Sequence, residues 1–328
     1  MKKAIIVACL GMLVSVFGAD AAMAKELWKV KTVIPRNSAF VLNYFGGRDA
    51  GIWRKHGIDL EIDARPFKGF AASLPAKEMM VGTYMGTAAI ARINKGFDWV
   101  IIGGGLTVMQ EVFVLKSSPF KTISDLRGKK FSSWSTGAGA FKATRAVIMD
   151  GFGIDVLKDT NFVQAAAPAL LKLLARGDVD SMFNISSLTI ATASQPDKYR
   201  SIFAPNDYWK KKTGQPIVWS APIVAWRSWV DEDRDRAKRF VKATHESYKW
   251  LRKPENLDAA VKKFGTLAAV KNQAQANVYK KWLSEGKLFM SKWDVKTRDN
   301  QWEFLKMAAK HGVLGKVPDK EKIGLILE

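Results

Sequence analysis

Residues Thr122–Asn184 contain the pattern that decides the fold: ISDLRGKKF (123–131), STGAGA (135–140), GFGID (151–155) and PALLKLLARGDVDSMF (168–183). A segment of strand length precedes the glycine-rich turn, and a helical pattern that ends at glycine follows it. The same order then repeats. The stretch therefore predicts two consecutive strand-to-helix units, whose turns expose backbone N–H groups.

The element boundaries within this stretch follow from its turn residues and its periodicity. Pro168 suits the first turn of a helix, and Gly177 suits the position that ends it. The expected elements are a strand at 129–134, a helix at 140–150, a strand at 161–164, a helix that begins at Pro168, and a strand at 179–183.

Toward the N-terminus, strands and helices alternate in the same way. Apolar and polar residues alternate in 28–34, and Asn37 or Ser38 can cap the helix that follows. Gly57 is a natural end for that helical region, before an alternating strand at 58–62. The further expected elements are a helix at 70–77, a strand at 79–82, a helix capped by Thr87 and ending near Gly96, and a strand at 99–102 closed by Gly103, Gly104 and Gly105.

Toward the C-terminus, the pattern first crosses to a new group of strands and later returns. A strand is expected at 111–116, with the crossing marked by Ser117–Pro119, and a return strand is expected at 216–225. From Asp231 onward the apolar spacing is helical. Alternating strands and helices predict mainly parallel α/β sheets, with ligands bound beyond the carboxyl ends of the strands.

Almost the whole of the expected mature chain resembles the periplasmic solute-binding proteins of ABC transporters in the nitrate, sulfonate and taurine group, the NMT1/THI5-like family. Two parts of the chain carry this resemblance most clearly. They are the stretch Thr122–Asn184 and GRDAGIWRKHGIDLEI (47–62). The family usually has a glycine and an acidic residue before its third strand, where this chain has Pro75–Glu78. The resemblance implies a type II periplasmic-binding-protein fold, in which two lobes are joined by two crossing segments and enclose a ligand cleft. The lobes implied are 25–115 with 216–328, and 116–215.

The N-terminus is typical of a secretory signal peptide. Lys2 and Lys3 precede an apolar run at 4–17, and Ala22-Met23-Ala24 is a small-x-small cleavage signal. The apolar run is too short for a membrane-spanning helix. We therefore expect a signal peptide at 1–24, cleavage after Ala24 and a periplasmic protein. Its one cysteine, Cys9, would be lost with the signal peptide, which leaves no disulfide or thiol chemistry.

The charge balance is strongly basic, with 52 Lys and Arg against 31 Asp and Glu and a formal net charge of +21. The basic residues are scattered along the chain, and no RNA- or DNA-binding motif accompanies them. We therefore expect no nucleic-acid partner. A basic surface is the simplest interpretation, with weak steering of an anionic ligand as an addition.

The candidate ligand contacts fall at the predicted strand ends. The turn after the strand at 129–134 offers backbone N–H groups to an anion without any lysine. Aromatic residues at strand ends can line a cleft or pack in the core, and Arg36 can bind a carboxylate or sulfonate or lie in solvent. Asn37, Ser38 and Asn184 are neutral donors with helix capping as the alternative. The predicted contacts are Arg36, Asn37, Ser38, Phe67, Tyr84, Trp134, Ser135, Thr136, Gly137, Asn184 and Trp219.

The sequence gives little support to an enzyme. His56, His245 and His311 lie far apart, and His245-Glu246 lacks the second histidine that a zinc helix needs. There is no G-x-S-x-G elbow, no complete dinucleotide fingerprint and no Walker loop. Related thiamine-pyrimidine synthases use a cysteine-rich iron motif, which this chain lacks. We therefore expect no catalytic residues, no cofactor and no metal.

The leading hypothesis is the solute-binding component of an ABC importer, which closes around a small anionic solute of the sulfonate, taurine or nitrate type. Its expected partners are that ligand and a transporter permease, and the protein is expected to be a monomer. Three alternatives stay open. The ligand could be a heteroaromatic or aromatic acid, such as a thiamine-precursor pyrimidine. The protein could instead be a periplasmic sensor subunit, or a secreted enzyme built on the same fold.

Overall fold

A parallel β-α-β unit begins the fold. The computed structural model describes residues 27–327, so the predicted signal peptide, its cleavage position and Cys9 lie outside the described residues. Strand β1 (Trp28–Pro35) pairs in parallel with β2 (Ile58–Arg65) along its whole length. Between them lie α1 (Ala39–Asp49) and α2 (Ile52–Lys55), and Gly57, with φ at 73°, ends this helical region as predicted.

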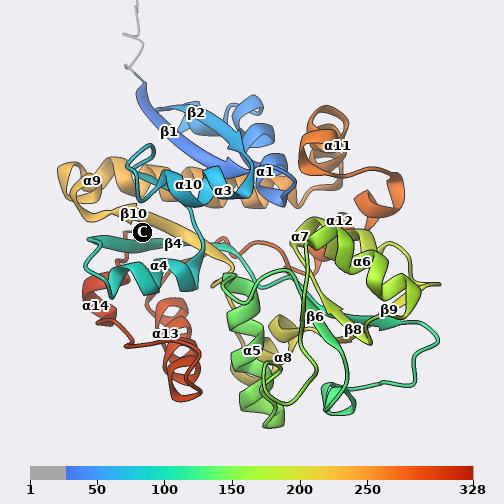
Figure 1. Ribbon diagram of the computed structural model, residues 1–328. Helices are drawn as coiled ribbons and strands as arrows, with labels where there is room; N and C mark the ends of the chain where they lie inside the picture. Colours follow the sequence, from blue (N-terminus) through green and yellow to red (C-terminus); the bar gives the residue numbers. More distant parts are fainter. Residues whose placement is uncertain (1–26, 328) are drawn as a thin grey trace, which may run out of the picture.

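A second sheet has the strand order β3-β10-β4, and the central strand runs antiparallel to both neighbours. Its strands are β3 (Val81–Thr83), β4 (Trp99–Leu106) and β10 (Ala221–Trp226). The helices that accompany it are α3 (Phe67–Ser73) and α4 (Gly86–Ile93). Because β4 leads the chain out of this group of strands and β10 brings it back, the two adjacent strands run in opposite directions. Together with β1 and β2, this sheet forms the first lobe (Figure 1).

The three consecutive glycines lie inside β4, so the prediction that they close this strand is wrong. A Cβ atom on Gly105 would lie 2.0 Å from the carbonyl oxygen of Ala221, and one on Gly103 would lie 2.6 Å from Ile223. Gly104 would meet the backbone carbonyl of Met290 at 2.6 Å. The glycines are therefore required because other chain segments approach β4 closely, and not because the strand ends there.

The second lobe contains a five-stranded sheet with the order β7-β6-β8-β5-β9. Its strands are β5 (Val112–Leu115), β6 (Phe131–Ser133), β7 (Val163–Gln164), β8 (Ser181–Phe183) and β9 (Tyr199–Phe203). Strand β6 runs parallel to β7 and β8, whereas β5 runs antiparallel to β8 and β9. The prediction of mainly parallel sheets therefore holds for the strand-to-helix units and fails for the strands that carry the chain between lobes.

The helices of the second lobe begin at the ends of these strands. They are the short η1 (Ile123–Leu126), α5 (Gly139–Phe152), α6 (Ala167–Arg176), α7 (Ser186–Ala193) and α8 (Pro205–Thr213). Pro168 lies in the first turn of α6, and Gly177 ends that helix with φ at 76°, both as predicted. The expected strand-to-helix units of residues 122–184 are therefore present.

The C-terminal part of the chain is helical, as predicted from Asp231 onward. It contains α9 (Arg227–Glu232), α10 (Arg234–Leu251), α11 (Pro254–Ala268), α12 (Gln273–Ser284), α13 (Val295–Lys310) and α14 (Lys320–Ile323). Helix α12 packs on α7 and α13 packs on α5, so these helices contact the second lobe (Figure 1). Within residues 27–327, no helix combines the length and the apolar character needed to cross a membrane.

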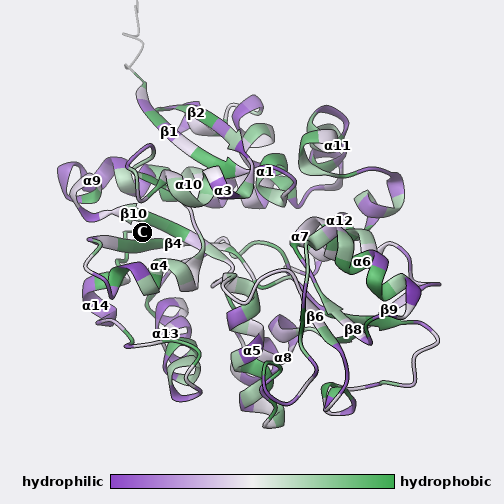
Figure 2. Ribbon diagram, in the orientation of Figure 1, coloured by the Kyte–Doolittle hydropathy of each residue, from purple (hydrophilic) through white to green (hydrophobic). Residues whose placement is uncertain are grey.

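The chain passes between the lobes twice. One crossing is 107–111, between β4 and β5, and the other is 215–220, between α8 and β10. The prediction that Ser117–Pro119 marks the first crossing is wrong, because β5 already belongs to the second-lobe sheet. A single buried apolar cluster extends past these crossings, from Tyr84 and Trp99 in the first lobe to Phe131 and Phe141 in the second. Figure 2 shows apolar residues along the strands, with polar residues on the outer helix faces. The crossings therefore form the floor between two packed lobes.

Candidate ligand-binding cavity

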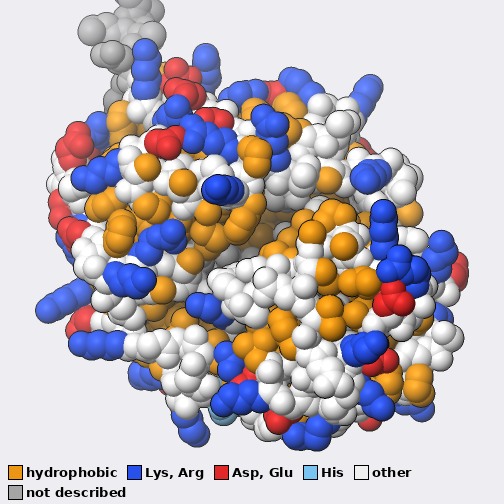
Figure 3. Space-filling view, in the orientation of Figure 1, with side chains coloured by type: hydrophobic (Ala, Val, Ile, Leu, Met, Phe, Trp, Pro, Cys, Tyr) orange, Lys and Arg blue, Asp and Glu red, His pale blue; other side chains and the backbone are white. Residues whose placement is uncertain are grey.

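A cavity of about 400 Å³ lies between the two lobes. Figure 3 shows a hollow there, with hydrophobic side chains on both sides and lysine and arginine side chains on the surrounding surface. Its wall comes from the first lobe, the second lobe and both crossings. The lining residues are Pro35, Arg36, Asn37, Ser38, Phe40, Pro66, Phe67, Phe70, Met85, Leu106, Gln110, Trp134, Ala138, Gly139, Ala140, Ala167, Ile185, Ser186, Ser220 and Ala221.

Helix starts make up much of this wall. Five helices of at least eight residues, α1, α4, α5, α6 and α7, each contribute residues from their first turn or N-cap to the cavity, and the short α3 contributes Pro66 and Phe67. None of their N-cap residues, Ser38, Met85, Ala138, Ala166 and Ile185, makes a side-chain cap hydrogen bond. The first N–H groups of a helix have no partner within the helix, and they carry the positive end of its dipole. The wall therefore favours negative charge in the cavity.

Of the helices that do not border the cavity, α2, α8, α9 and α11 also lack a side-chain cap, whereas four others have one. Asp233, Asn272, Asp294 and Asp319 each accept a hydrogen bond from a first-turn N–H group of α10, α12, α13 and α14. Such caps are the usual way in which a helix start is satisfied. The five helices at the cavity have no side-chain acceptor at their N-caps, and the first N–H of α4, that of Gly86, donates instead to Ser220 O at 3.4 Å.

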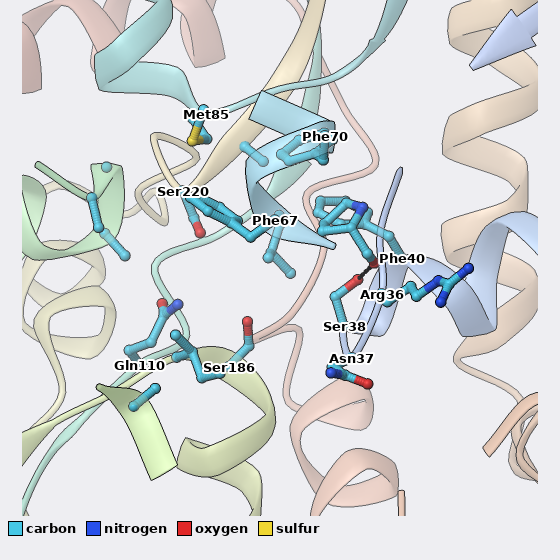
Figure 4. Close-up of a pocket in the computed structure, with 18 of the residues that line it drawn as sticks. Arg36, Asn37, Ser38, Phe40, Phe67, Phe70, Met85, Gln110, Ser186 and Ser220 are labelled. Atoms are coloured by element: carbon cyan, nitrogen blue, oxygen red, sulfur yellow. Dashed lines mark hydrogen bonds between the residues drawn. The ribbon is translucent and has the colours of Figure 1, made fainter. Parts of the chain in front are cut away.

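Aromatic and apolar side chains form the rest of the wall. Phe40, Phe67, Phe70 and Met85 line the cavity (Figure 4). Trp134 lines it as well. The ring of Trp134 stacks on Phe183, with 5.6 Å between centroids and an interplanar angle of 17°. Phe67 begins α3 and is 56% exposed, which is unusual for a phenylalanine in a folded protein. A ligand with an apolar body would cover this ring.

The first crossing contributes a buried amide to the floor. Gln110 lines the cavity and is only 4% exposed. Its Oε1 is shielded from solvent and has no hydrogen-bond partner among the described residues. In Figure 4 its carboxamide points up from the floor, toward Ser220. The neighbouring Glu111, which does not line the cavity, is buried beside Lys287, and burial raises the pKa of its carboxyl group.

Arg36 borders the cavity without directing its charge into it. Its Nε donates a hydrogen bond of 2.7 Å to the carbonyl oxygen of Ala64, and the guanidinium points away from the other labelled residues in Figure 4. The expected bidentate arrangement toward the cleft is therefore not formed. Among the described residues, Arg36 is the only ionisable one on the cavity wall. The positive electrostatic potential in the cavity therefore comes more from backbone N–H groups at helix starts than from charged side chains.

Asn37 and Ser38 both line the cavity, but neither caps α1 through its side chain. Asn37 has φ at 56°, a left-handed conformation that asparagine tolerates better than most residues, and its N–H donates to Leu267 O at 2.9 Å. The Ser38 hydroxyl donates to the carbonyl oxygen of Pro35 at 2.7 Å. Ser38 is the N-cap residue of α1, as predicted, but without a side-chain cap hydrogen bond. Thr87 lies inside α4, whose N-cap is Met85, so the cap expected there is wrong.

Three predicted contacts lie one layer behind the wall, so the prediction that they face the cleft is wrong. Tyr84 is buried, and its hydroxyl donates to the carbonyl oxygen of Ala71 in α3 at 2.5 Å. Trp219 is buried against Trp302, and its Nε1 donates to Gln301 O at 3.1 Å. Asn184 is buried and links the starts of α6 and α7. Each of these side chains holds elements of the wall in place.

The glycine-rich turn borders the cavity, but three residues later than predicted. Ser135, Thr136 and Gly137 do not line it, because the turn carries them toward solvent, and the N–H of Gly137 donates to the Ser135 hydroxyl at 3.2 Å. The lining residues are instead those of 138–140, at the start of α5. A Cβ on Gly139 would lie 3.1 Å from Trp219 O and 3.2 Å from Thr87 Oγ1, so this glycine lets α5 begin close to the second crossing.

Several lining residues were not predicted from the sequence. Among them, Gln110 is the one with a buried amide side chain. A signal for it was present, since Gln110 and Glu111 interrupt an otherwise apolar run, VMQEVFVL (108–115), shortly before the crossing that was predicted at Ser117–Pro119. Phe40, Phe70 and Met85 gave no such signal, because apolar residues on amphipathic elements are usually core. Within residues 27–327, no group of three His, Cys, Asp or Glu side chains has an arrangement suited to a metal ion.

Comparisons with known proteins agree on one kind of fold. The sequence model of the family described as NMT1/THI5 like matches residues 40–256. The periplasmic aliphatic sulphonate-binding protein SsuA from Escherichia coli is structurally similar, with a TM-score of 0.69, 14% identity and 92% of each chain covered. The periplasmic nitrate-binding protein NrtA from Synechocystis PCC 6803 has a TM-score of 0.63 and 13% identity, with 90% of this chain and 84% of that chain covered.

An enzyme is also among the structurally similar proteins. The desulfurization enzyme DSZB has a TM-score of 0.60 and 11% identity, with 91% of this chain and 96% of that chain covered. At such identities, the likeness concerns the fold. A comparison with curated protein sequences gives no significant match.

Proposed function

The chain belongs to the NMT1/THI5-like family, and from this premise we propose that it is the solute-binding component of an ABC importer. The fold supports this proposal, because two lobes joined by two crossings can close around a solute by hinge motion. The cavity of about 400 Å³ is within the usual range for small-molecule sites. We propose that it acts as a periplasmic monomer that docks on a permease. The lobes expected from the sequence, 25–115 with 216–328 and 116–215, need one change, because β5 (Val112–Leu115) belongs to the sheet of the second lobe.

The proposed ligand is a small organic anion. The observation that carries this proposal is the convergence of five helix starts without side-chain caps on one cavity. Backbone N–H groups at helix starts bind sulfonate, carboxylate or phosphate oxygens without a lysine or an arginine. The net charge of +21 would steer an anion toward the protein.

The size and chemistry of the wall favour an organic ligand over nitrate. Nitrate would leave most of the cavity unfilled, and it would cover neither Phe67 nor Trp134. The aromatic side chains instead suit an apolar body attached to the anionic group. The proposed ligand is therefore a carboxylate or sulfonate with an apolar, planar part, rather than a short alkyl sulfonate or an inorganic ion.

An enzyme is the second candidate, because a desulfurization enzyme has the same fold. The cavity wall offers serine hydroxyls, at Ser38, Ser186 and Ser220, but no carboxylate, imidazole or thiol from the described residues. A serine nucleophile needs an adjacent base. Product analysis by mass spectrometry after incubation with aryl sulfonates and esters would detect turnover and separate this candidate from a binding protein.

Titration calorimetry with a panel of anions tests the proposed function. The panel contains benzoate, benzenesulfonate, taurine, methanesulfonate and nitrate, and small-angle X-ray scattering of the same mixtures measures lobe closure. We expect benzoate or benzenesulfonate to bind more tightly than the other three and to reduce the radius of gyration. If no member of the panel binds and the radius stays constant, the proposal is wrong.

A further inference from the structure

Among the described residues of the cavity wall, Gln110 is the one buried polar side chain that has no hydrogen-bond partner. Its side chain is 4% exposed, yet no hydrogen bond joins its carboxamide to any described residue, and Oε1 is shielded from solvent. A buried polar atom without a partner costs free energy, so buried amides are nearly always paired. A methionine or leucine at this position would avoid that cost.

No hydrogen bond within the described residues offsets this cost in free energy for Gln110. Other buried amides of the chain hold elements together: Gln301 accepts from Val218 N at 3.0 Å and donates to Pro216 O at 2.8 Å, and Asn184 donates to Ala167 O at 2.9 Å. Gln110 has no such contact. Its carboxamide is instead at the floor of the cavity, on the crossing that connects β4 to β5.

We propose that Gln110 determines ligand specificity by hydrogen bonding to a neutral polar substituent on the apolar part of the ligand. This inference rests on the proposed function, and it narrows the ligand class to hydroxy- or amino-substituted aromatic carboxylates and sulfonates. Rotation about the last side-chain bond can turn either Oε1 or Nε2 toward the cavity. A hydroxyl group pairs with either atom, because it both donates and accepts.

Different parts of the cavity wall have separate roles in this proposal. Helix starts favour the anionic group, the aromatic side chains favour the ring, and Gln110 then discriminates between rings with and without a polar substituent. Sites that hydrogen-bond a substrate hydroxyl reject the analogue that lacks it, because a buried group would stay unpaired. Gln110 therefore acts on the choice between closely related anions, and not on the capture of anions in general.

Matched pairs of ligands test this inference: benzoate with 3- and 4-hydroxybenzoate, and benzenesulfonate with 4-aminobenzenesulfonate. In the natural protein we expect at least one substituted member to bind at least tenfold more tightly than its parent. In Gln110→Met we expect that preference to fall below threefold, with the affinity for the parent unchanged or higher. Gln195→Met is the control, because Gln195 donates to Ala191 O at 2.9 Å in α7 but does not line the cavity.

Thermal unfolding without ligand gives a second readout, which also detects a folding defect. Removal of an unpartnered buried amide should raise the Tm in Gln110→Met, whereas Gln195→Met should lower it. A lower Tm in Gln110→Met would indicate a structural role and overturn the inference. So would an equal preference in the natural protein and Gln110→Met, or equal binding of parent and substituted anions to the natural protein. In the last case the proposed function stands, but if no anion of any pair binds, it fails together with the inference.

Discussion

The Nδ2 atom of Asn184 donates a hydrogen bond of 2.9 Å to the carbonyl oxygen of Ala167, the first residue of α6. Its Oδ1 accepts from the N–H of Ile185 at 2.8 Å, at the N-cap of α7. One side chain therefore joins two of the helix starts that line the cavity, although it does not line the cavity itself. Asn184 is a positioning residue for both.

Replacement of Asn184 by alanine should loosen the starts of α6 and α7. We expect a loss of about 1–3 kcal/mol in the free energy of unfolding, because buried backbone groups lose their partner. Amide hydrogen exchange should quicken in the first turns of both helices. Asn161→Ala is the control, since Asn161 also donates to a carbonyl oxygen, that of Gly128 at 2.9 Å, but at an exposed position away from the cavity. Equal exchange in the two variants would contradict this role.

Replacement of Phe67 by alanine should weaken binding without affecting stability. Phe67 is 56% exposed in the free protein, so its removal should change the free energy of unfolding by no more than about 0.5 kcal/mol. A ligand that covers the ring should lose about tenfold in affinity, or about 1.4 kcal/mol. Val295, which is 55% exposed and begins α13 away from the cavity, is a matched control. Calorimetry should find unchanged affinity in Val295→Ala, and similar affinities in both variants would refute the assignment.

The two glycines of the STGAGA turn should respond differently to alanine. A Cβ at Gly139 would meet Trp219 O at 3.1 Å and Thr87 Oγ1 at 3.2 Å, whereas the nearest atom to one at Gly137 is the Ser135 hydroxyl at 3.7 Å. Gly139→Ala should displace the start of α5, with a cost of about 1–3 kcal/mol in stability and weaker anion binding. Gly137→Ala should be nearly neutral in both. Urea unfolding and calorimetry measure the two effects, and a neutral Gly139→Ala would show that α5 can shift freely.

The ion pair of Arg145 and Asp155 should contribute stability above the ordinary aspartate pKa. Arg145 Nε and Nη2 both lie 2.6 Å from carboxylate oxygens of Asp155, which is 6% exposed, and this contact lowers the pKa of Asp155 below its usual 3.8. A lowered pKa gives stability that is present above pH 3.8 and disappears as the pH falls through the folded-state value. Asp155→Asn should therefore destabilise the protein at pH 7, by about 3 kcal/mol for a buried pair.

The pH dependence separates this effect from a packing defect. The difference in unfolding free energy between the natural protein and Asp155→Asn should shrink as the pH falls below 3.8. Asp235→Asn is the control, because Asp235 pairs with Arg239 at the surface, where ion pairs contribute little. Urea unfolding between pH 7 and pH 3 measures both. A difference that is independent of pH would mean that the charge of Asp155 is not the cause.

The sequence predicted the elements of residues 122–184 well, because their signals are local. Pro168 and Gly177 mark a helix start and a helix end through backbone conformation alone, and the structure has both where they were expected. The prediction for Gly103, Gly104 and Gly105, that they end a strand, was wrong. Their role depends on β10 and residues 290–292, which lie more than a hundred residues away in the sequence. Local reasoning assigns such glycines to a turn.

The cavity wall was predicted only in part, for a related reason. Strand ends point to the correct region, so Asn37, Ser38, Phe67 and Trp134 line the cavity as expected, and Arg36 borders it. Whether an aromatic side chain faces the cavity or the core depends on its rotamer and its neighbours, and Tyr84 and Trp219 point into the core. Which residues of the STGAGA turn face inward depends on where α5 begins, and Gly139 permits a start next to Trp219.

A titration followed by NMR tests the central claim that helix starts hold the ligand's anionic group. Benzoate and benzenesulfonate are added to ¹⁵N-labelled protein, and the amide signals of Gly139, Ala140 and Ser186 are followed. We predict saturable shifts of these three signals that are larger than those of the capped helix starts at Arg236 and Thr297. Saturable shifts confined to residues outside the cavity, with these three amides unchanged, would contradict the account.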